Sequence, residues 1–189
     1  MLNRRAFMDN ALTLCAQQAR RGEPVAALMF DLDFFKSIND RFGHAVGDSV
    51  LRVFGQVVRA STRVDDIIGR FGGEEFIAIV PGGWESVSKI AERVRSGFEV
   101  AGATIGTHTV GATVSIGAAI SYDPVTAIDA LIARADAALY RAKHDGRNRL
   151  HVAEEEMASE RARLIAAARR VRPVRTDAFA RVSQHKTAF

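Results

Sequence analysis

The chain has 189 residues, 48% of them hydrophobic, and a formal net charge of +4. This length and apolar content suit one folded domain with an appendage, and they exclude disorder over most of the chain. Residues 154–189 carry most of the net charge: they have 8 basic and 5 acidic residues, a net of +3, whereas residues 1–153 have 18 basic and 17 acidic residues, a net of +1. A main domain of nearly neutral charge argues against nucleic-acid binding.

The cysteine content and the apolar runs constrain where the protein works. The single cysteine, Cys15, excludes an internal disulfide and suits a reducing cytoplasm. No apolar run approaches the ~20 residues that span a bilayer, and no signal peptide opens the chain. We therefore expect a cytoplasmic protein without a membrane segment of its own, unless a membrane or sensory part lies outside this sequence.

The first half of the chain predicts a helix, a buried strand, two helices and a hairpin. A helix over residues 4–21 precedes the apolar run 25–32, which predicts a central strand covered on both faces. Residues 33–42 predict a helix that Gly43 interrupts, and a longer helix follows to about residue 60. Strands at 67–71 and 76–80 are predicted to meet at a two-residue turn, Gly72-Gly73, since glycine tolerates the positive φ of such turns.

The second half predicts further helices and strands, and hence an α+β fold. The apolar spacing from Val87 to Phe98 predicts a helix, followed by strands at 104–110 and 112–121. A helix from Ile128 to near Lys143 and a short strand at 149–152 complete a sheet with helices packed against it. Residues 154–172 are Ala-rich, with charges that suit a helix dipole, and they predict a last helix. We expect one domain over residues 1–153 and an appendage over 154–189.

Carboxylates stand at two of the predicted turns. Asp31 lies near the end of the buried strand, and Glu74 and Glu75 follow the bare backbone of Gly72 and Gly73, which a polyphosphate can approach. Mg²⁺ takes one or two protein carboxylates and fills its other positions with water and phosphate oxygens. The alternatives are a helix-capping aspartate and a solvated hairpin tip. Because adjacent strand residues face opposite ways, we expect only one glutamate to point at Asp31.

Asn39 and Asp48 flank the predicted corner between two helices. An amide both donates and accepts, and a carboxylate accepts from two N–H groups, so the pair suits the edge of a guanine base. Alternatively, Asn39 caps the first helix and Asp48 occupies the first turn of the second. Spacing alone favours this structural alternative.

Five motifs, in this order, resemble those of the GGDEF-domain diguanylate cyclases. They occupy residues 2–7, 31–36, 42–48, 70–76 and 138–148, and the resemblance spans about residues 2–152. The resemblance implies a palm-like α/β sandwich of the nucleotidyl-cyclase, ferredoxin-like kind. It agrees with the α+β order of elements predicted above.

The resemblance also implies roles for the matching residues. Asp31 and Glu74 would hold Mg²⁺ or Mn²⁺ with the Leu32 carbonyl, and Glu74 would assist deprotonation of the attacking hydroxyl. Asn39 and Asp48 would bind guanine. The other implied substrate contacts are Lys36, His44, Gly72, Gly73, Glu75, Lys143 and Arg147, the last two at the terminal phosphates, although alone these two would indicate a solvated helix end. Asp33 matches the motif but is expected to be structural.

A second site is implied around Arg63 and Asp66, which match the Arg-x-x-Asp motif where cyclic di-GMP inhibits members of the family. Arginine can bind phosphate through its planar fork, and Asp accepts guanine donors. Arg93 or Arg95 would complete this site. Without the resemblance, residues 63–66 are an ordinary charged loop.

The implied reaction is Mg²⁺-dependent condensation of two GTP molecules into cyclic di-GMP and two pyrophosphates. One site binds one GTP, so a homodimer is expected for turnover, with an upstream sensory domain or partner controlling it. The alternative is a non-catalytic cyclic di-GMP receptor, which the retained carboxylates disfavour. A cyclase with adenine-containing products is disfavoured by Asp48, and a polymerase-like role by the neutral body. The helix predicted after residue 154 has three open roles: pairing two chains, packing, or disorder.

Overall fold

The structure, a computed structural model, describes residue 2 and residues 4–122 and 127–153. Its centre is a five-stranded sheet in the order β2-β3-β1-β6-β7, with β1 in the middle. β1 runs antiparallel to both neighbours, β2 is antiparallel to β3, and β7 is parallel to β6. The strands are β1 (Val25–Leu32), β2 (Ile67–Arg70), β3 (Glu75–Pro81), β6 (Val114–Ser121) and β7 (Leu150–Val152).

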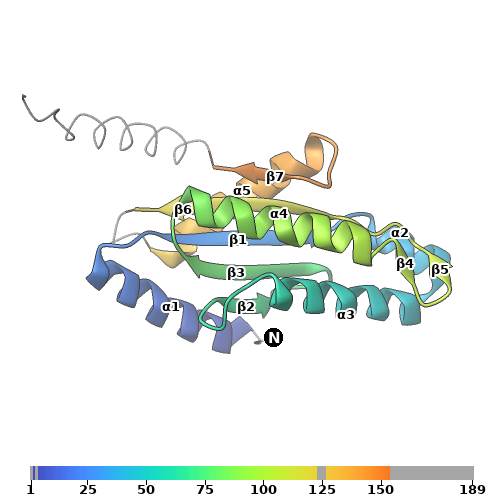
Figure 1. Cartoon of the computed structure of the whole chain (residues 1–189), viewed down its shortest axis with the longest axis horizontal. Helices are drawn as coiled ribbons and strands as arrows, with labels where there is room; N and C mark the ends of the chain where they lie inside the picture. The colour runs from blue at the N-terminus through green and yellow to red at the C-terminus, as the bar shows by residue number, and fades with distance from the viewer. Residues whose placement is uncertain (1, 3, 123–126, 154–189) are drawn as a thin grey trace, which may run out of the picture.

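Helices cover both faces of this sheet (Figure 1). α3 and α4 pack against one face, α1 and α5 pack against the other, and α2 follows directly on the end of β1. The sheet therefore has its apolar side chains buried between two layers, as its continuous apolar central strand predicted. The helices are α1 (Arg4–Arg21), α2 (Phe35–Phe42), α3 (His44–Ala60), α4 (Trp84–Ala101) and α5 (Ile128–His144).

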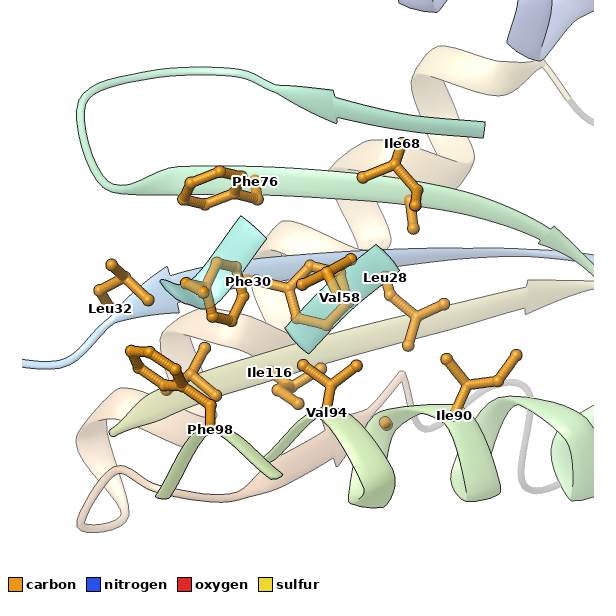
Figure 2. Packing of buried hydrophobic residues seen from close by; sticks show 14 of the residues in the cluster. Leu28, Phe30, Leu32, Val58, Ile68, Phe76, Ile90, Val94, Phe98 and Ile116 are labelled. Atoms are coloured by element: carbon orange, nitrogen blue, oxygen red, sulfur yellow. The ribbon is translucent and has the colours of Figure 1, made fainter. Parts of the chain in front are cut away.

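Side chains of β1 alternate between the two apolar layers. Leu28 and Phe30 join the layer under α3 and α4, whereas Ala27 and Met29 join the layer under α1 and α5. In the first layer, the ring of Phe54 lies 4.8, 4.9 and 5.9 Å from those of Phe76, Phe98 and Phe30, respectively. Figure 2 shows side chains of the strands and of α3 and α4 meeting in this layer. The alternation places the Asp31 side chain on the α5 face.

Most element bounds predicted from the sequence are confirmed, including residues 4–21 and 25–32 without change. The break between α2 and α3 falls at Gly43, whose φ of 85° lies in the region that favours glycine. The short strand predicted at 149–152 is β7, and the helix predicted from residue 128 is α5. The α+β class is therefore confirmed.

The predicted two-residue turn at Gly72 and Gly73 is wrong, although the hairpin itself is present. β2 ends at Arg70 and β3 begins at Glu75, and neither glycine has a positive φ. The side chain of Arg70 instead closes a wider loop, since its Nε donates to the carbonyls of both glycines at 3.1 Å. The backbone N–H groups of Phe71 and Gly72 also donate to the Glu75 carbonyl, at 2.8 and 3.3 Å, so the loop closes without a positive φ at either glycine.

The strand predicted over residues 104–110 is also wrong. Gly106, with φ of 61°, reverses the chain, and the segment forms a separate small hairpin of β4 (Thr104–Ile105) and β5 (His108–Thr109). The helix predicted over 154–172 lies outside the described residues, so the division at residue 153 stays a prediction. None of the helices within the described ranges is long and apolar enough to cross a membrane.

Candidate active site

The carboxylates predicted to act together lie at the end of β1. Asp31 pairs in register with Glu75 across β1 and β3, and directly opposed residues place their side chains on the same face. Glu74 lies in the loop before β3, where its carbonyl accepts the Leu32 N–H at 3.3 Å. Both glutamates are close enough to Asp31 to contribute to raising its pKa. The structure therefore places both glutamates near Asp31.

The sequence predicted that only one glutamate points toward Asp31, on the premise that Glu74 and Glu75 both belong to a strand. That premise is wrong. Only Glu75 belongs to β3, and alternation does not constrain Glu74 in the loop. Because Glu75 stands opposite Asp31, it is a candidate cation ligand alongside the predicted Glu74. The sequence could not show this, since it depended on which residue begins the strand.

Burial and a lysine decide the charge state of Asp31. Its side chain is only 7% exposed, and this loss of solvation is the main reason that its pKa is raised. Lys143, in the last turn of α5, opposes that rise because its Nζ lies 2.7 Å from Asp31 Oδ2. Desolvation and the two glutamates together outweigh Lys143, so the pKa of Asp31 stays above its ordinary value. A further cation near Asp31 would therefore stabilise its charged form.

The donor set fits a hard divalent cation carrying a nucleotide. Asp31, Glu74 and Glu75 offer carboxylate oxygens and Leu32 offers a backbone carbonyl. In the part of the chain that the structure describes, no three acidic, His or Cys side chains form a metal-holding group by themselves. An incomplete protein shell is typical of Mg²⁺, which keeps waters and takes phosphate oxygens from its ligand.

A pocket of about 720 Å³ lies between α3 and the β2–β3 loop, the loop that also carries Glu74. It brings together Asp48 and Gly72, two residues that the sequence assigned to the substrate. Arg70 and Phe71 line the same pocket, as does Arg52 of α3.

The structural alternatives for Asn39 and Asp48 are not observed. The N-caps of α2 and α3 are Phe34 and Gly43, and neither makes a side-chain cap. Asn39 lies in the second half of α2, with its side-chain oxygen against the α-carbon of Gly47, where a Cβ would overlap it. α3 begins at His44, so the exposed Asp48 falls in its second turn. Neither position is explained by capping.

The predicted cationic contacts lie on α2, α3 and α5 and in the loop after α5. Lys143 is ion-paired with Asp31, and the Arg147 guanidinium lies 4.4 Å from the centroid of the Phe34 ring. Lys36 belongs to the first turn of α2, and His44 begins α3, with both side chains exposed to solvent. Lys143 at the end of α5 and Arg147 in the loop after it thus contact Asp31 and Phe34, at and just after the end of β1.

Asp33 has the structural role expected of it. Its carboxylate is 3% exposed and accepts hydrogen bonds from Thr113 Oγ1 at 2.7 Å and Ser115 Oγ at 2.6 Å. The backbone N–H of Asn148 donates to it at 3.1 Å. Asp33 therefore ties β1 to the start of β6 and to the loop after α5. Sequence reasoning missed these partners; the polar Ser115 within an apolar run was the available signal.

The Arg-x-x-Asp motif lies at a second pocket, of about 620 Å³, on the loop after α3. Asp66 is 7% exposed, which raises its pKa, and its Oδ2 accepts the Arg63 N–H at 2.7 Å. Arg93 donates to the Ser61 carbonyl at 2.6 Å and lowers the Asp66 pKa, so it lies close by. Arg95 is instead bonded to Glu92, Glu99 and Asn148. The structure thus favours Arg93 over Arg95.

Comparisons with known proteins agree with this architecture. The family model described as diguanylate cyclase, GGDEF domain, matches residues 1–149. The response regulator PleD of Caulobacter vibrioides is 39% identical over 151 residues, covering 78% of this chain and 33% of PleD. Diguanylate cyclase A of Treponema denticola is 36% identical over 152 residues, covering 80% of this chain and 41% of the relative.

Solved structures show the same fold. The active GGEEF domain of a diguanylate cyclase from Vibrio cholerae matches with a TM-score of 0.75 and 30% identity, covering 80% of this chain and 97% of that one. The GGDEF domain of DgcB from Caulobacter crescentus, in complex with c-di-GMP, matches with a TM-score of 0.73 and 34% identity, covering 82% and 92%. The predicted palm-like cyclase fold is confirmed. The chain spans less than half the length of these two curated relatives, and it belongs to the GGDEF-domain diguanylate cyclase family.

Proposed function

We propose that this chain is a Mg²⁺-dependent diguanylate cyclase domain, which condenses two GTP molecules into cyclic di-GMP. The observation that carries the proposal is that Glu74 and Glu75 both lie near Asp31 at the end of β1, while Asp48 and Gly72 line one pocket. Relatives named diguanylate cyclases, and domains of this fold solved with c-di-GMP, support it.

Each residue of the site has a distinct task in this proposal. Asp31, Glu74 and the Leu32 carbonyl, with Glu75 as a further donor, would hold a divalent cation, which neutralises phosphate charge when bound. Asn39 and Asp48 orient the guanine. Lys143 and Arg147 bind the terminal phosphates, so that the 3′-hydroxyl of a second GTP meets the α-phosphate in line with the leaving pyrophosphate. Glu74 accepts the proton of that hydroxyl.

One such site holds one GTP, and the product contains two equivalent linkages, so two domains must face each other. The decisive experiment incubates the pure chain with GTP and Mg²⁺ over a series of protein concentrations and quantifies cyclic di-GMP by chromatography. We expect product formation to rise more steeply than first order in protein and to stop with a chelator. Tight binding of cyclic di-GMP with no turnover at any concentration would instead establish the receptor alternative.

Replacing Asp48 by alanine is expected to weaken the preference for GTP over ATP. A carboxylate that accepts two guanine N–H groups contributes charge-assisted hydrogen bonds, whose loss should lower GTP affinity about 10- to 100-fold. ATP affinity should change little. Binding titrations with both nucleotides measure this, with Ser49→Ala on the same helix as control. Unchanged selectivity in Asp48→Ala would mean that guanine is bound elsewhere.

Replacing Arg63 by alanine is expected to relieve product inhibition, since the second pocket would lose a charge-assisted contact to the bound dinucleotide. The concentration of cyclic di-GMP that halves the rate should rise about tenfold or more. Arg20→Ala, at an exposed position on α1, is the matched control and should leave inhibition unchanged. An unaltered inhibition curve for Arg63→Ala would exclude this pocket as the inhibitory site.

A further inference from the structure

Phe34 is a large apolar side chain that the core does not use. It follows Asp33 at the end of β1 and is 62% exposed, with a left-handed backbone of φ 55° and ψ 28°. This conformation is rare for a bulky residue, and such outliers cluster at functional sites. Phe34 makes no side-chain cap on α2, so neither burial nor capping explains an aromatic residue here.

The face of the Phe34 ring carries the Arg147 guanidinium, whose Cζ lies 4.4 Å from the ring centroid. A guanidinium above an aromatic face is attracted by the ring quadrupole. Arg147 also has a left-handed backbone, with φ of 62°, and its N–H donates to the Ala142 carbonyl at 3.0 Å. Two residues distant in sequence thus adopt uncommon conformations where they meet.

The next residue anchors the backbone of this arginine. Asn148, with φ of 44°, donates its N–H to the buried carboxylate of Asp33 and its side-chain amide to Glu99, at 2.8 Å. Its side-chain oxygen accepts from Arg95 at 3.0 Å. The backbone after Arg147 is therefore fixed to β1 and to α4, which leaves the orientation of the long side chain to be set by Phe34.

We propose that Phe34 is a positioning residue that holds the Arg147 guanidinium ready for the terminal phosphates of the nucleotide. The inference rests on the proposed GTP site. Contact with the ring face fixes the position of the guanidinium carbon, and the N–H donors that do not point into the ring stay available to phosphate oxygens. Holding a flexible arginine in one orientation before the ligand arrives lowers the entropy lost on binding.

The test compares two guanine nucleotides that differ in their outer phosphates, each with Mg²⁺. One is the α,β-methylene analogue of GTP, which cannot be cyclised, and the other is GMP. Phe34→Leu keeps the apolar bulk and the β-carbon but removes the aromatic face. We expect Phe34→Leu to lower the affinity for the triphosphate analogue about two- to fivefold and to leave the affinity for GMP unchanged. Phe34→Tyr, which restores the aromatic face, should restore the affinity.

Two controls separate positioning from a general structural effect. Tyr140→Leu removes another exposed aromatic ring and should leave both affinities unchanged. In an Arg147→Ala background, Phe34→Leu should have no further effect, since the two residues act as one unit. The inference would be overturned if Phe34→Leu lowered the affinities for both nucleotides equally. It would also be overturned if Phe34→Leu had its full effect in the Arg147→Ala background. If the unaltered chain binds neither nucleotide, the proposed GTP site itself is wrong.

Discussion

Replacing Asp31 by asparagine is expected to lower cyclic di-GMP formation about 100- to 1,000-fold while making the folded chain more stable. Asparagine keeps the shape of the side chain but removes the charge that a cation at the end of β1 requires. The loss of a preorganised electrostatic group at a reacting centre has effects of about this size. Stability should rise because burial makes the charged form of Asp31 unfavourable, as its raised pKa shows.

The stability gain should depend on pH in a defined direction. Between its ordinary pKa, near 3.8, and its raised value in the folded chain, Asp31 binds more proton in the folded state than in the unfolded state. Stability therefore falls as pH rises through this window, and the full penalty applies above it. The melting temperatures of the unaltered chain and Asp31→Asn should converge below the ordinary pKa and differ most at neutral pH.

Thermal unfolding in a chelating buffer, followed across pH, measures the stability effect, and chromatography of GTP reactions measures the activity. Asp40→Asn is a matched control, because Asp40 is exposed on α2 and should change neither property. Near-normal turnover in Asp31→Asn would remove Asp31 from the cation site. A lower melting temperature at neutral pH would show that the ion pair with Lys143 stabilises more than burial costs.

Local patterns predicted much of this structure, because they depend on neighbours in sequence. The apolar run over β1 predicted bounds that the structure reproduces, and the helix predicted over residues 4–21 is α1 without change. Gly43 marked the break between α2 and α3. In contrast, the loop at Gly72 and Gly73 is closed by backbone hydrogen bonds to Glu75 and by the Arg70 side chain, which glycine content does not reveal.

The sequence predicted which residues belong to the candidate site, but not which of them lie next to one another in the fold. The motifs placed the acidic residues, the residues proposed to bind guanine and the basic residues on separate segments, and only the resemblance grouped them into one site. The register of β1 with β3 then decided that Glu75 stands opposite Asp31. The stacking of Arg147 on Phe34 joins residues more than a hundred positions apart, so no spacing could have indicated it.

Asp33 lies two positions after Asp31, yet replacing it by alanine is expected to destabilise the fold by about 3–5 kcal/mol. Its carboxylate accepts from Thr113, Ser115 and the Asn148 backbone, and hydrogen bonds to a charged group contribute about 1.5–3 kcal/mol each without being additive. Alanine would leave these donors unpaired in a buried place, separating β1 from β6 and from the loop that carries Arg147.

Denaturant unfolding of Asp33→Ala, beside the unaltered chain and Ser115→Ala, measures this difference. Ser115→Ala removes one donor and leaves the carboxylate two partners, so it should lose clearly less stability than Asp33→Ala. A decrease below about 1 kcal/mol for Asp33→Ala would contradict the network, since that is the contribution of a single ordinary hydrogen bond. Opposite stability changes would show that the two aspartates of one motif have different roles. Burial disfavours the charge of Asp31. Asp33, in contrast, stabilises the fold through hydrogen bonds from three donors.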